Sequence, residues 1–245
     1  MSQEKLDIVI VGAHWRTPHL SLWRYWQIVV NSPGVRWQCV DVCQDADTVA
    51  LLAGRPHVEV LEVPEEQRFD VVRADAFQHG VDHALATYEA DYLMVMHSDA
   101  WPVQPGWFKA VAHGLGSRCR ATGYVMEQDP AWPNRKRHVR CCYCAVPFSD
   151  ARRFRYDWCS NDWPRHTENV DELGVTVWDA AEKVSIDIHA RGGEVSALNS
   201  GEYWSPWLFH KGHSDPSTLG NRNAWQHHLE MTIKAWHAQA QSEGR

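Results

Sequence analysis

The sequence contains no run of apolar residues long enough to cross a bilayer, which would take about 20 residues. It also lacks a basic surplus, because 24 lysines and arginines stand against 31 aspartates and glutamates, a net charge of −7. This balance argues against nucleic acid or an anionic membrane as the main partner. No internal repeat, low-complexity segment or linker divides the 245 residues, so we expect a single domain, 1–245.

Two further absences concern the cellular compartment. The opening Met-Ser-Gln-Glu-Lys-Leu-Asp has neither the basic nor the apolar region of a signal peptide, and we expect a cytoplasmic protein. The seven cysteines are an odd number, so a disulfide framework is not expected. Cys141, Cys142 and Cys144 lack the spacing of a zinc site and favour core packing. Strand alternation would place Cys142 and Cys144 on one face.

Short apolar runs alternate with stretches of helical periodicity. In the first half this order predicts a mostly parallel sheet covered by helices on both faces. The second half, from about residue 121, predicts mixed β structure and loops, and 148–177 and 199–223 show no clear period. Strands are expected at 6–13, 37–42, 58–63, 92–96, 122–127, 138–146 and 194–198, and helices at 20–30, 48–53, 75–89, 108–115, 179–190 and 224–240.

The strand at 92–96 ends in a polar triplet, His97-Ser98-Asp99. The carboxyl ends of strands form the usual ligand-binding edge of an open α/β sheet. An imidazole and a carboxylate two residues apart can converge on one cation such as Mn²⁺, whereas carboxylates with diphosphate oxygens suit Mg²⁺. The alternative is that the triplet simply begins a surface loop. The turn at Gly12-Ala13-His14 lacks the glycine fingerprint of dinucleotide binders, which disfavours a Rossmann dehydrogenase.

Residues 79–107 resemble the core of the GT-A-fold glycosyltransferases, especially the inverting family two. The shared features are a helix with Gly80 and Asp82, the Ala-Asp-Tyr at 90–92, an apolar strand, a metal motif, and a Pro-Gly-Trp at 105–107. His97 departs from the pattern, because it stands where the family has the first Asp of Asp-x-Asp. The resemblance implies a Rossmann-like GT-A fold, with a nucleotide-sugar-binding half at 1–120 and an acceptor-binding half at 121–245.

The resemblance also implies roles for individual residues. Asp99 would be the main metal ligand, and His97 would contact the metal or the ribose. Ala13 and His14 would flank the nucleotide base, and Asp41 would lie against it, although an Asp after a strand is also common turn chemistry. The remaining residues assigned to the nucleotide-sugar site are His79, Asp82 and Ser98.

Inverting sugar transfer requires a general base that takes the proton of the acceptor hydroxyl. The segment 178–192 resembles the helix from which the family supplies this base, although the usual Glu-Asp pair is absent. We choose Asp179 as the base, with Glu182 as its rival. A capping box is the alternative, with Asp179 as the N-cap residue and Glu182 three residues later.

A histidine-containing segment follows near the C-terminus, His210-Lys211-Gly212-His213. Members of the resembled fold often supply a further metal or diphosphate ligand from such a position. His210 or His213 could serve in this way, and Lys211 could face a phosphate. The alternative is a solvated polar loop.

The expected protein is therefore a glycosyltransferase that moves a sugar from a nucleotide-diphosphate donor to an acceptor hydroxyl with inversion. A UDP-sugar is the favoured donor, the acceptor is small or carrier-bound, and Mn²⁺ or Mg²⁺ assists the departure of the diphosphate. Three alternatives stay open: a nucleotidyltransferase of related fold, a metal-dependent hydrolase, and a non-catalytic sugar-binding module that uses some of the 14 tryptophans.

Overall fold

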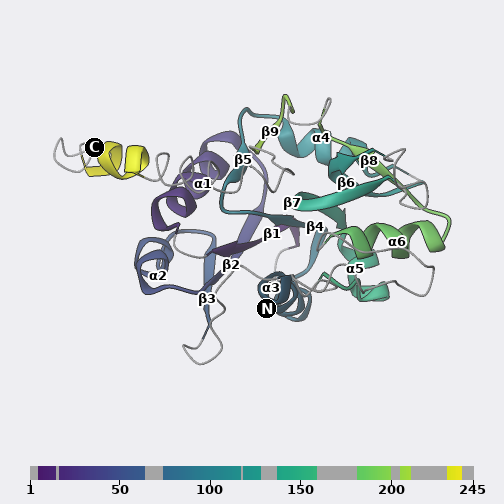
Figure 1. The fold of residues 1–245 in the computed structure, drawn as a ribbon, viewed down its shortest axis with the longest axis horizontal. Helices are drawn as coiled ribbons and strands as arrows, with labels where there is room; N and C mark the ends of the chain where they lie inside the picture. The colour runs from purple at the N-terminus through teal and green to yellow at the C-terminus, as the bar shows by residue number, and fades with distance from the viewer. Residues whose placement is uncertain are drawn as a thin grey trace, which may run out of the picture.

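A seven-stranded sheet with the order β3-β2-β1-β4-β7-β6-β8 forms the centre of the computed structural model (Figure 1). The described residues are 5–14, 17–63, 74–116, 118–127, 137–158, 181–199, 205–210 and 231–238. The strands of this sheet are β1 (Leu6–His14), β2 (Trp37–Cys43), β3 (Val58–Glu62), β4 (Ala90–Met96), β6 (Cys119–Met126), β7 (His138–Pro147) and β8 (Glu194–Ala197). A second sheet pairs β5 (Ala100–Pro102) with β9 (Leu208–His210).

The first four strands of the large sheet are parallel, as the alternation of strands and helices predicts. β1 pairs in parallel with both β2 and β4, and β2 pairs in parallel with β3. β7 then enters antiparallel between β4 and β6, which joins the two halves of the chain in one sheet. The helices are α1 (Pro18–Asn31), α2 (Ala46–Leu52), α3 (Ala74–Thr87), α4 (Trp107–Gly114), α5 (Phe148–Phe154) and α6 (Glu182–Ala190), and residues 231–238 are also helical.

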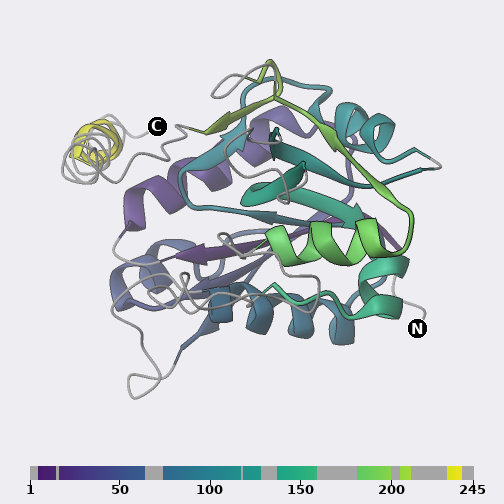
Figure 2. The ribbon, with the colours of Figure 1, turned by 45° about the vertical axis from the view of Figure 1, so that its right-hand side comes forward.

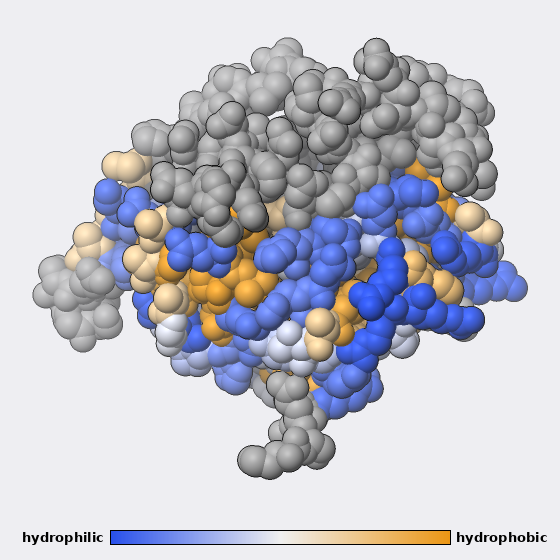
Figure 3. Space-filling model, turned by 90° about the horizontal axis from the view of Figure 1, so that it is seen from below, coloured by the Kyte–Doolittle hydropathy of each residue, from blue (hydrophilic) through white to orange (hydrophobic). Residues whose placement is uncertain are grey.

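Two hydrophobic cores lie on opposite faces of the sheet because successive side chains of a strand point to opposite sides. In β1, Val9 and Val11 pack with residues of α3, α5 and α6. Ile8 and Ile10 pack on the other face with residues of α1, α2 and α4. Figure 2 shows α3 and α6 below the sheet and α1 and α4 above it. On the side that α3 covers, hydrophilic side chains cover much of the described surface (Figure 3).

The cysteines of β7 do not follow simple alternation. Cys144 packs in the core beside α3, whereas Cys142 packs in the core on the α1 side, so the prediction that they share a face is wrong. The reason is an irregularity in the ladder, where the register with β6 shifts between Gly123 and Tyr124. Such a bulge changes which residues face which core. The free cysteines are Cys39, Cys43, Cys142 and Cys144, which are buried, and Cys119, which is partly exposed.

The second half of the chain departs most from expectation. The predicted helix 179–190 begins at Glu182, and its N-cap residue is Ala181, without a side-chain cap. Asp179, the N-cap residue of the alternative capping box, lies outside the described residues. Helix α5 and strand β9 fall within 148–177 and 199–223, where no regular structure was predicted. In the first half, no strand was predicted at 100–102, the position of β5. Within the described ranges, no helix has the length and apolar character needed to cross a membrane.

Candidate functional site

The carboxyl ends of β1 and β4 meet at one edge of the sheet because these strands are neighbours and parallel. Val11 is the ladder partner of Val95, so the residues that follow each strand end emerge side by side. His14 is the last residue of β1, and His97 is the first residue after β4. This edge is where ligands bind in open α/β sheets.

The triplet His97-Ser98-Asp99 forms a tight turn after β4. The backbone N–H of His97 donates to the carbonyl of Cys142 on β7, at 3.0 Å, and the N–H of Ala100 donates back to the carbonyl of His97, at 3.1 Å. The turn brings His97 Nδ1 within 3.8 Å of Asp99 Oδ1. Asp99 is buried and His97 is only partly buried. The two polar side chains therefore share one side of the turn.

Phe77 of α3 supports the His97 ring from below. The two rings are stacked, with their centroids 5.3 Å apart and their planes 10° from parallel. Phe77 is itself held in the core, where it is 2% exposed. The stack restricts the rotation of the imidazole about its side-chain bonds. Sequence reasoning missed this contact, because one aromatic residue in a predicted helix carries no sign of which partner it will meet.

Strand β9 brings the C-terminal histidine segment to the same turn. In its antiparallel pairing with β5, Ala100 is the partner of His210 and Trp101 is the partner of Phe209. The rings of Trp101 and Phe209 stack with centroids 4.6 Å apart. The backbone of His210 thus lies beside the residue that follows Asp99, although the two are more than 100 positions apart in the sequence. His213 and Lys211 lie outside the described residues.

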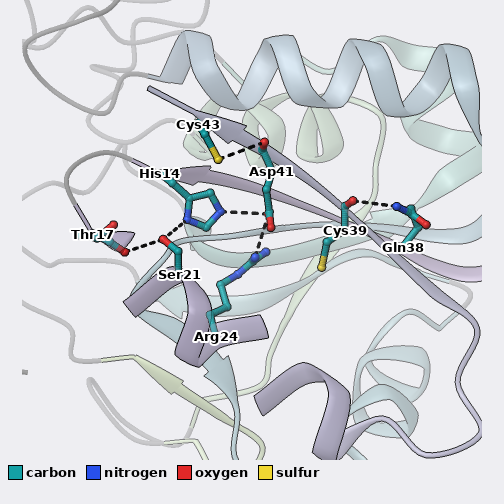
Figure 4. Close-up of polar contacts among 8 residues, drawn as sticks. All are labelled: His14, Thr17, Ser21, Arg24, Gln38, Cys39, Asp41 and Cys43. Atoms are coloured by element: carbon teal, nitrogen blue, oxygen red, sulfur yellow. Dashed lines mark hydrogen bonds and ion pairs between the residues drawn. The ribbon is translucent and has the colours of Figure 1, made fainter. Parts of the chain in front are cut away.

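A buried polar network joins the ends of β1 and β2 to α1 (Figure 4). Arg24 Nη1 donates to Asp41 Oδ1 at 2.9 Å, and His14 Nε2 lies 3.0 Å from the same oxygen. On its other side, His14 Nδ1 lies 2.7 Å from Ser21 Oγ, which donates to the carbonyl of Thr17. The side chains of His14, Ser21, Arg24 and Asp41 are completely buried. Ser21, His14 and Asp41 have the residue types of a catalytic triad. They are structural here, because the serine is buried where no substrate can reach it.

The electrostatics of the network favour an ionised Asp41. Burial alone would raise the pKa of this carboxyl, but Arg24 and His14 outweigh burial and lower the pKa to about 2. On the same face of β2, burial and the Asp41 carboxylate raise the pKa of the Cys39 thiol, which stays protonated. Arg24 was missed by sequence reasoning, yet it is the single charged residue between Leu20 and Val30.

Gly12 makes room for this network. It is the ladder partner of Asp41, and a Cβ at position 12 would lie 2.4 Å from Asp41 Oδ1 and 2.5 Å from His14 Nε2. Such distances are far inside van der Waals contact. The absent side chain therefore allows a carboxylate, an imidazole and a guanidinium to meet over the backbone of β1.

Comparison with solved structures finds this architecture in two sugar-transferring enzymes. LgtC, a galactosyltransferase solved with donor and acceptor sugar analogues, has a TM-score of 0.53 at 12% identity, covering 93% of this chain and 96% of that one. PcManGT, a mannosyltransferase from Pyrobaculum calidifontis solved with GDP-Man and Mn²⁺, has a TM-score of 0.56 at 12% identity, covering 96% and 65%. This is the GT-A fold. No protein-family model and no curated protein sequence matches the chain.

The GT-A fold confirms the predicted α/β class, with a mostly parallel sheet flanked by helices and antiparallel strands in the second half. The other residues assigned to the nucleotide-sugar site are spread over several environments. Ala13 is buried at the end of β1, while His79 and Asp82 are exposed on α3, where Asp82 accepts a hydrogen bond from Gln78. Ser98 is partly buried within the turn.

The turn at 97–99 has donor atoms suited to a divalent cation. Two atoms that each lie about 2.1 Å from one ion can be at most about 4.2 Å apart. The 3.8 Å between His97 Nδ1 and Asp99 Oδ1 satisfies this limit. Among the side chains that the structure describes, no set of three metal-ligating residues is gathered, and the side chain of His210 is not among them. The described residues of the turn could therefore supply one nitrogen and one carboxylate ligand.

Of the two candidate bases, the structure describes Glu182, at the start of α6. Glu182 is its first residue and is 1% exposed, and Ser185 accepts a hydrogen bond from the backbone N–H of Val139, at 2.9 Å. Asp179 lies outside the described residues. Ser185 thus links α6 to β7. The same strand contains Cys142, which accepts the hydrogen bond from the backbone N–H of His97.

A groove of about 860 Å³ runs between α4 and β8, away from the His97-Asp99 turn. Its lining includes Lys109 and His113 of α4, Ser196 of β8, Cys119 and Trp207. None of the residues assigned from sequence to the donor, metal or base lines it.

Proposed function

We propose that the protein is a glycosyltransferase that uses a nucleotide-diphosphate sugar and transfers the sugar to an acceptor hydroxyl with inversion. The observation that carries the proposal is the meeting, at the ligand-binding edge of a GT-A fold, of the His97-Asp99 turn with strand β9. A turn that merely began a surface loop would not need a buried carboxylate or a second strand laid along it.

His97 and Asp99 would hold a divalent cation, with His210 or His213 as a further ligand. When bound, the cation would offset the negative charge that develops on the departing diphosphate. Support comes from the spacing of the His97 and Asp99 donor atoms and from the ladder partnership of Ala100 and His210. Mn²⁺ and Mg²⁺ are the two ions considered. Lys211 would add a point charge toward the phosphates.

Asp179, three positions before Glu182 in the sequence, would take the acceptor proton, with Glu182 as its rival. Removing this proton raises the nucleophilicity of the acceptor oxygen at the moment of displacement. In this proposal Ala13 and His14 flank the nucleotide base with their backbone, because the side chains of both residues are buried. The Asp41 carboxylate is held by Arg24 inside the core. Asp41 would therefore affect the nucleotide base indirectly, through the position of the neighbouring strand β1.

A thermal-shift panel of nucleoside diphosphates, each with and without Mn²⁺, tests the proposal. UDP is the first choice, and GDP, ADP and CDP complete the panel. We expect one nucleotide to raise the melting temperature with Mn²⁺, and we expect Asp99→Asn to lose that increase. Asp91→Asn is a matched control, because it removes an exposed carboxylate at the other end of β4. No stabilisation by any nucleotide would refute the proposal.

A further inference from the structure

We propose that the groove between α4 and β8 is a second carbohydrate site, which holds the distal part of an acidic oligosaccharide acceptor. The inference rests on the proposed function and adds the chemical class of the acceptor. Its basis is the groove itself, of about 860 Å³, together with an exposed lysine and histidine on α4 and the partly exposed indole of Trp207. Sites for small molecules commonly have volumes of about 300–1,000 Å³.

The lining of the groove differs in charge from the protein as a whole. The chain has a net charge of −7, yet the part of the lining that the structure describes contains no aspartate or glutamate. Lys109 and His113 are both exposed and lie four residues apart on α4, about 6 Å along the helix axis. Within the described ranges, neither side chain has a hydrogen bond or an ion pair. An ammonium and an imidazole N–H at this spacing suit carboxylates that repeat along a sugar chain.

Trp207 lies at the end of the groove where α4 begins. Its backbone carbonyl accepts a hydrogen bond from the N–H of Val103 at 3.0 Å, and its own N–H donates to Ser205 Oγ at 3.2 Å. The indole lies against Gly106, where a Cβ would be 3.5 Å from Trp207 Cζ3. The side chain is only partly buried, so it combines a held position with an open apolar face. Such a face suits the C–H surface of a sugar ring, and the indole N–H adds a hydrogen-bond donor.

The other end of the groove is fixed by close contact between α4 and β8. Ser196 Oγ donates a hydrogen bond to the carbonyl of Gly114 at 2.8 Å. A Cβ at Gly114 would lie only 2.4 Å from Thr122 Oγ1, so the C-terminal end of α4 sits directly on the sheet. The groove is therefore formed by contacts within the protein, and a ligand does not have to order its walls before it binds.

Strand β9 connects the groove to the proposed transfer site. Trp207 immediately precedes β9, and His210, at the end of that strand, is the ladder partner of Ala100, which follows Asp99. Three residues of extended strand span about 10 Å, so this is the distance along β9 between the indole and the turn. An acceptor that contacts both places must be longer than one sugar ring. The arrangement therefore predicts an oligosaccharide.

The test measures the binding of two carboxylate-bearing tetrasaccharides, tetragalacturonate and a hyaluronan tetrasaccharide, by isothermal titration calorimetry. Fully methyl-esterified tetragalacturonate is the neutral comparison. We expect at least one acidic tetrasaccharide to bind, the neutral one to bind about ten-fold more weakly, and Lys109→Gln to weaken the acidic ligand by a similar factor. Trp207→Ala should weaken the acidic ligand about ten-fold or more. Lys234→Gln, which removes an exposed lysine from the helical residues 231–238, is the matched control and should bind as wild type does.

Failure of both acidic tetrasaccharides to bind would overturn the inference. Binding that is equal in wild type, Lys109→Gln and Trp207→Ala would also overturn it, because the ligand would then lie elsewhere. Far-ultraviolet circular dichroism establishes that each variant is folded, and Lys109→Gln changes only an exposed side chain.

The nucleotide panel separates this inference from the proposed function. Stabilisation by a nucleotide without tetrasaccharide binding would remove the second carbohydrate site and leave sugar transfer in place. Tetrasaccharide binding that depends on Lys109 and Trp207, without stabilisation by any nucleotide, would support a carbohydrate-binding groove and remove the proposed transfer.

Discussion

Arg24 donates a hydrogen bond of 2.9 Å to Asp41, and both side chains are completely buried. The pair links the middle of α1 to the carboxyl end of β2, directly beside the strand end that carries His14. Taking two charges out of water is costly, and the cost is offset only while both partners remain. This dependence makes the fold sensitive to the loss of either partner.

Arg24→Met should therefore lower the free energy of unfolding by about 3–5 kcal/mol, because it leaves the Asp41 carboxylate buried without its guanidinium. Urea denaturation measures the change. The double variant Arg24→Met, Asp41→Leu should recover much of the loss, since apolar replacements remove the buried charge. Arg36→Gln is a comparison at the surface, where Arg36 pairs with Asp7 and where the expected cost is at most about 1 kcal/mol. A similar small cost for Arg24→Met would contradict the prediction.

The low pKa of Asp41 predicts an acid-dependent loss of stability. Its value in the folded protein, about 2, lies below that of an unfolded aspartate, about 3.9. The ionised carboxylate thus stabilises the fold above about pH 4, and this contribution of about 2 kcal/mol is lost as the pH falls toward 2. Unfolding free energies measured between pH 5 and pH 2 should fall less steeply in Asp41→Asn than in wild type. Parallel curves for the two proteins would show that Asp41 is not held ionised.

Gly12→Ala should destabilise the protein by about 1–3 kcal/mol or more, because the added Cβ would overlap Asp41 and His14. Gly116→Ala is the matched control: no atom lies within 4 Å of a Cβ at that position, and the expected change is within about 0.5 kcal/mol. Thermal or urea unfolding of the two variants gives the comparison. Equal stabilities would mean that the strand end can relax around a methyl group.

The sequence predicted the elements whose signal is local. The apolar runs of β1 and β4 are long enough to identify a buried strand, and their alternation with helical stretches requires parallel pairing. Three-residue strands such as β5 and β9 carry no such signal. Each exists because the other is beside it, and the partners Trp101 and Phe209 are more than 100 residues apart.

The same limit applies to the candidate site. Asp99 was found from the strand that precedes it, which is a local feature. The ion pair of Arg24 with Asp41 and the stack of Phe77 on His97 depend on how α1 and α3 dock on the sheet. The sequence contained a signal in one case: Arg24 is the single charged residue in the predicted helix 20–30. Other residues, such as His79, were assigned through the family resemblance. For His79, which is exposed on α3, the sequence itself gives no sign of its contacts.

The identity of the general base gives a prediction that separates catalysis from packing. Glu182 is 1% exposed in the first turn of α6, beside Ala181 and Val184 of the core, so its carboxylate is part of a packed helix end. Glu182→Gln keeps the shape of the side chain and should retain most of the turnover. Asp179→Asn should reduce kcat by about 100-fold or more with little change in donor binding, because loss of a general base affects the chemical step.

Steady-state kinetics with saturating donor, together with the melting temperature of each variant, distinguish these roles. A loss of stability in Glu182→Gln with kcat retained supports Glu182 as a structural residue. The reverse pattern, with kcat lost in Glu182→Gln and kept in Asp179→Asn, would transfer the base to Glu182. In that case the buried carboxylate would have to become accessible when the acceptor binds, because a base must reach within hydrogen-bonding distance of the proton that it removes. Protection of α6 from hydrogen exchange, measured with and without acceptor, would then reveal that opening directly.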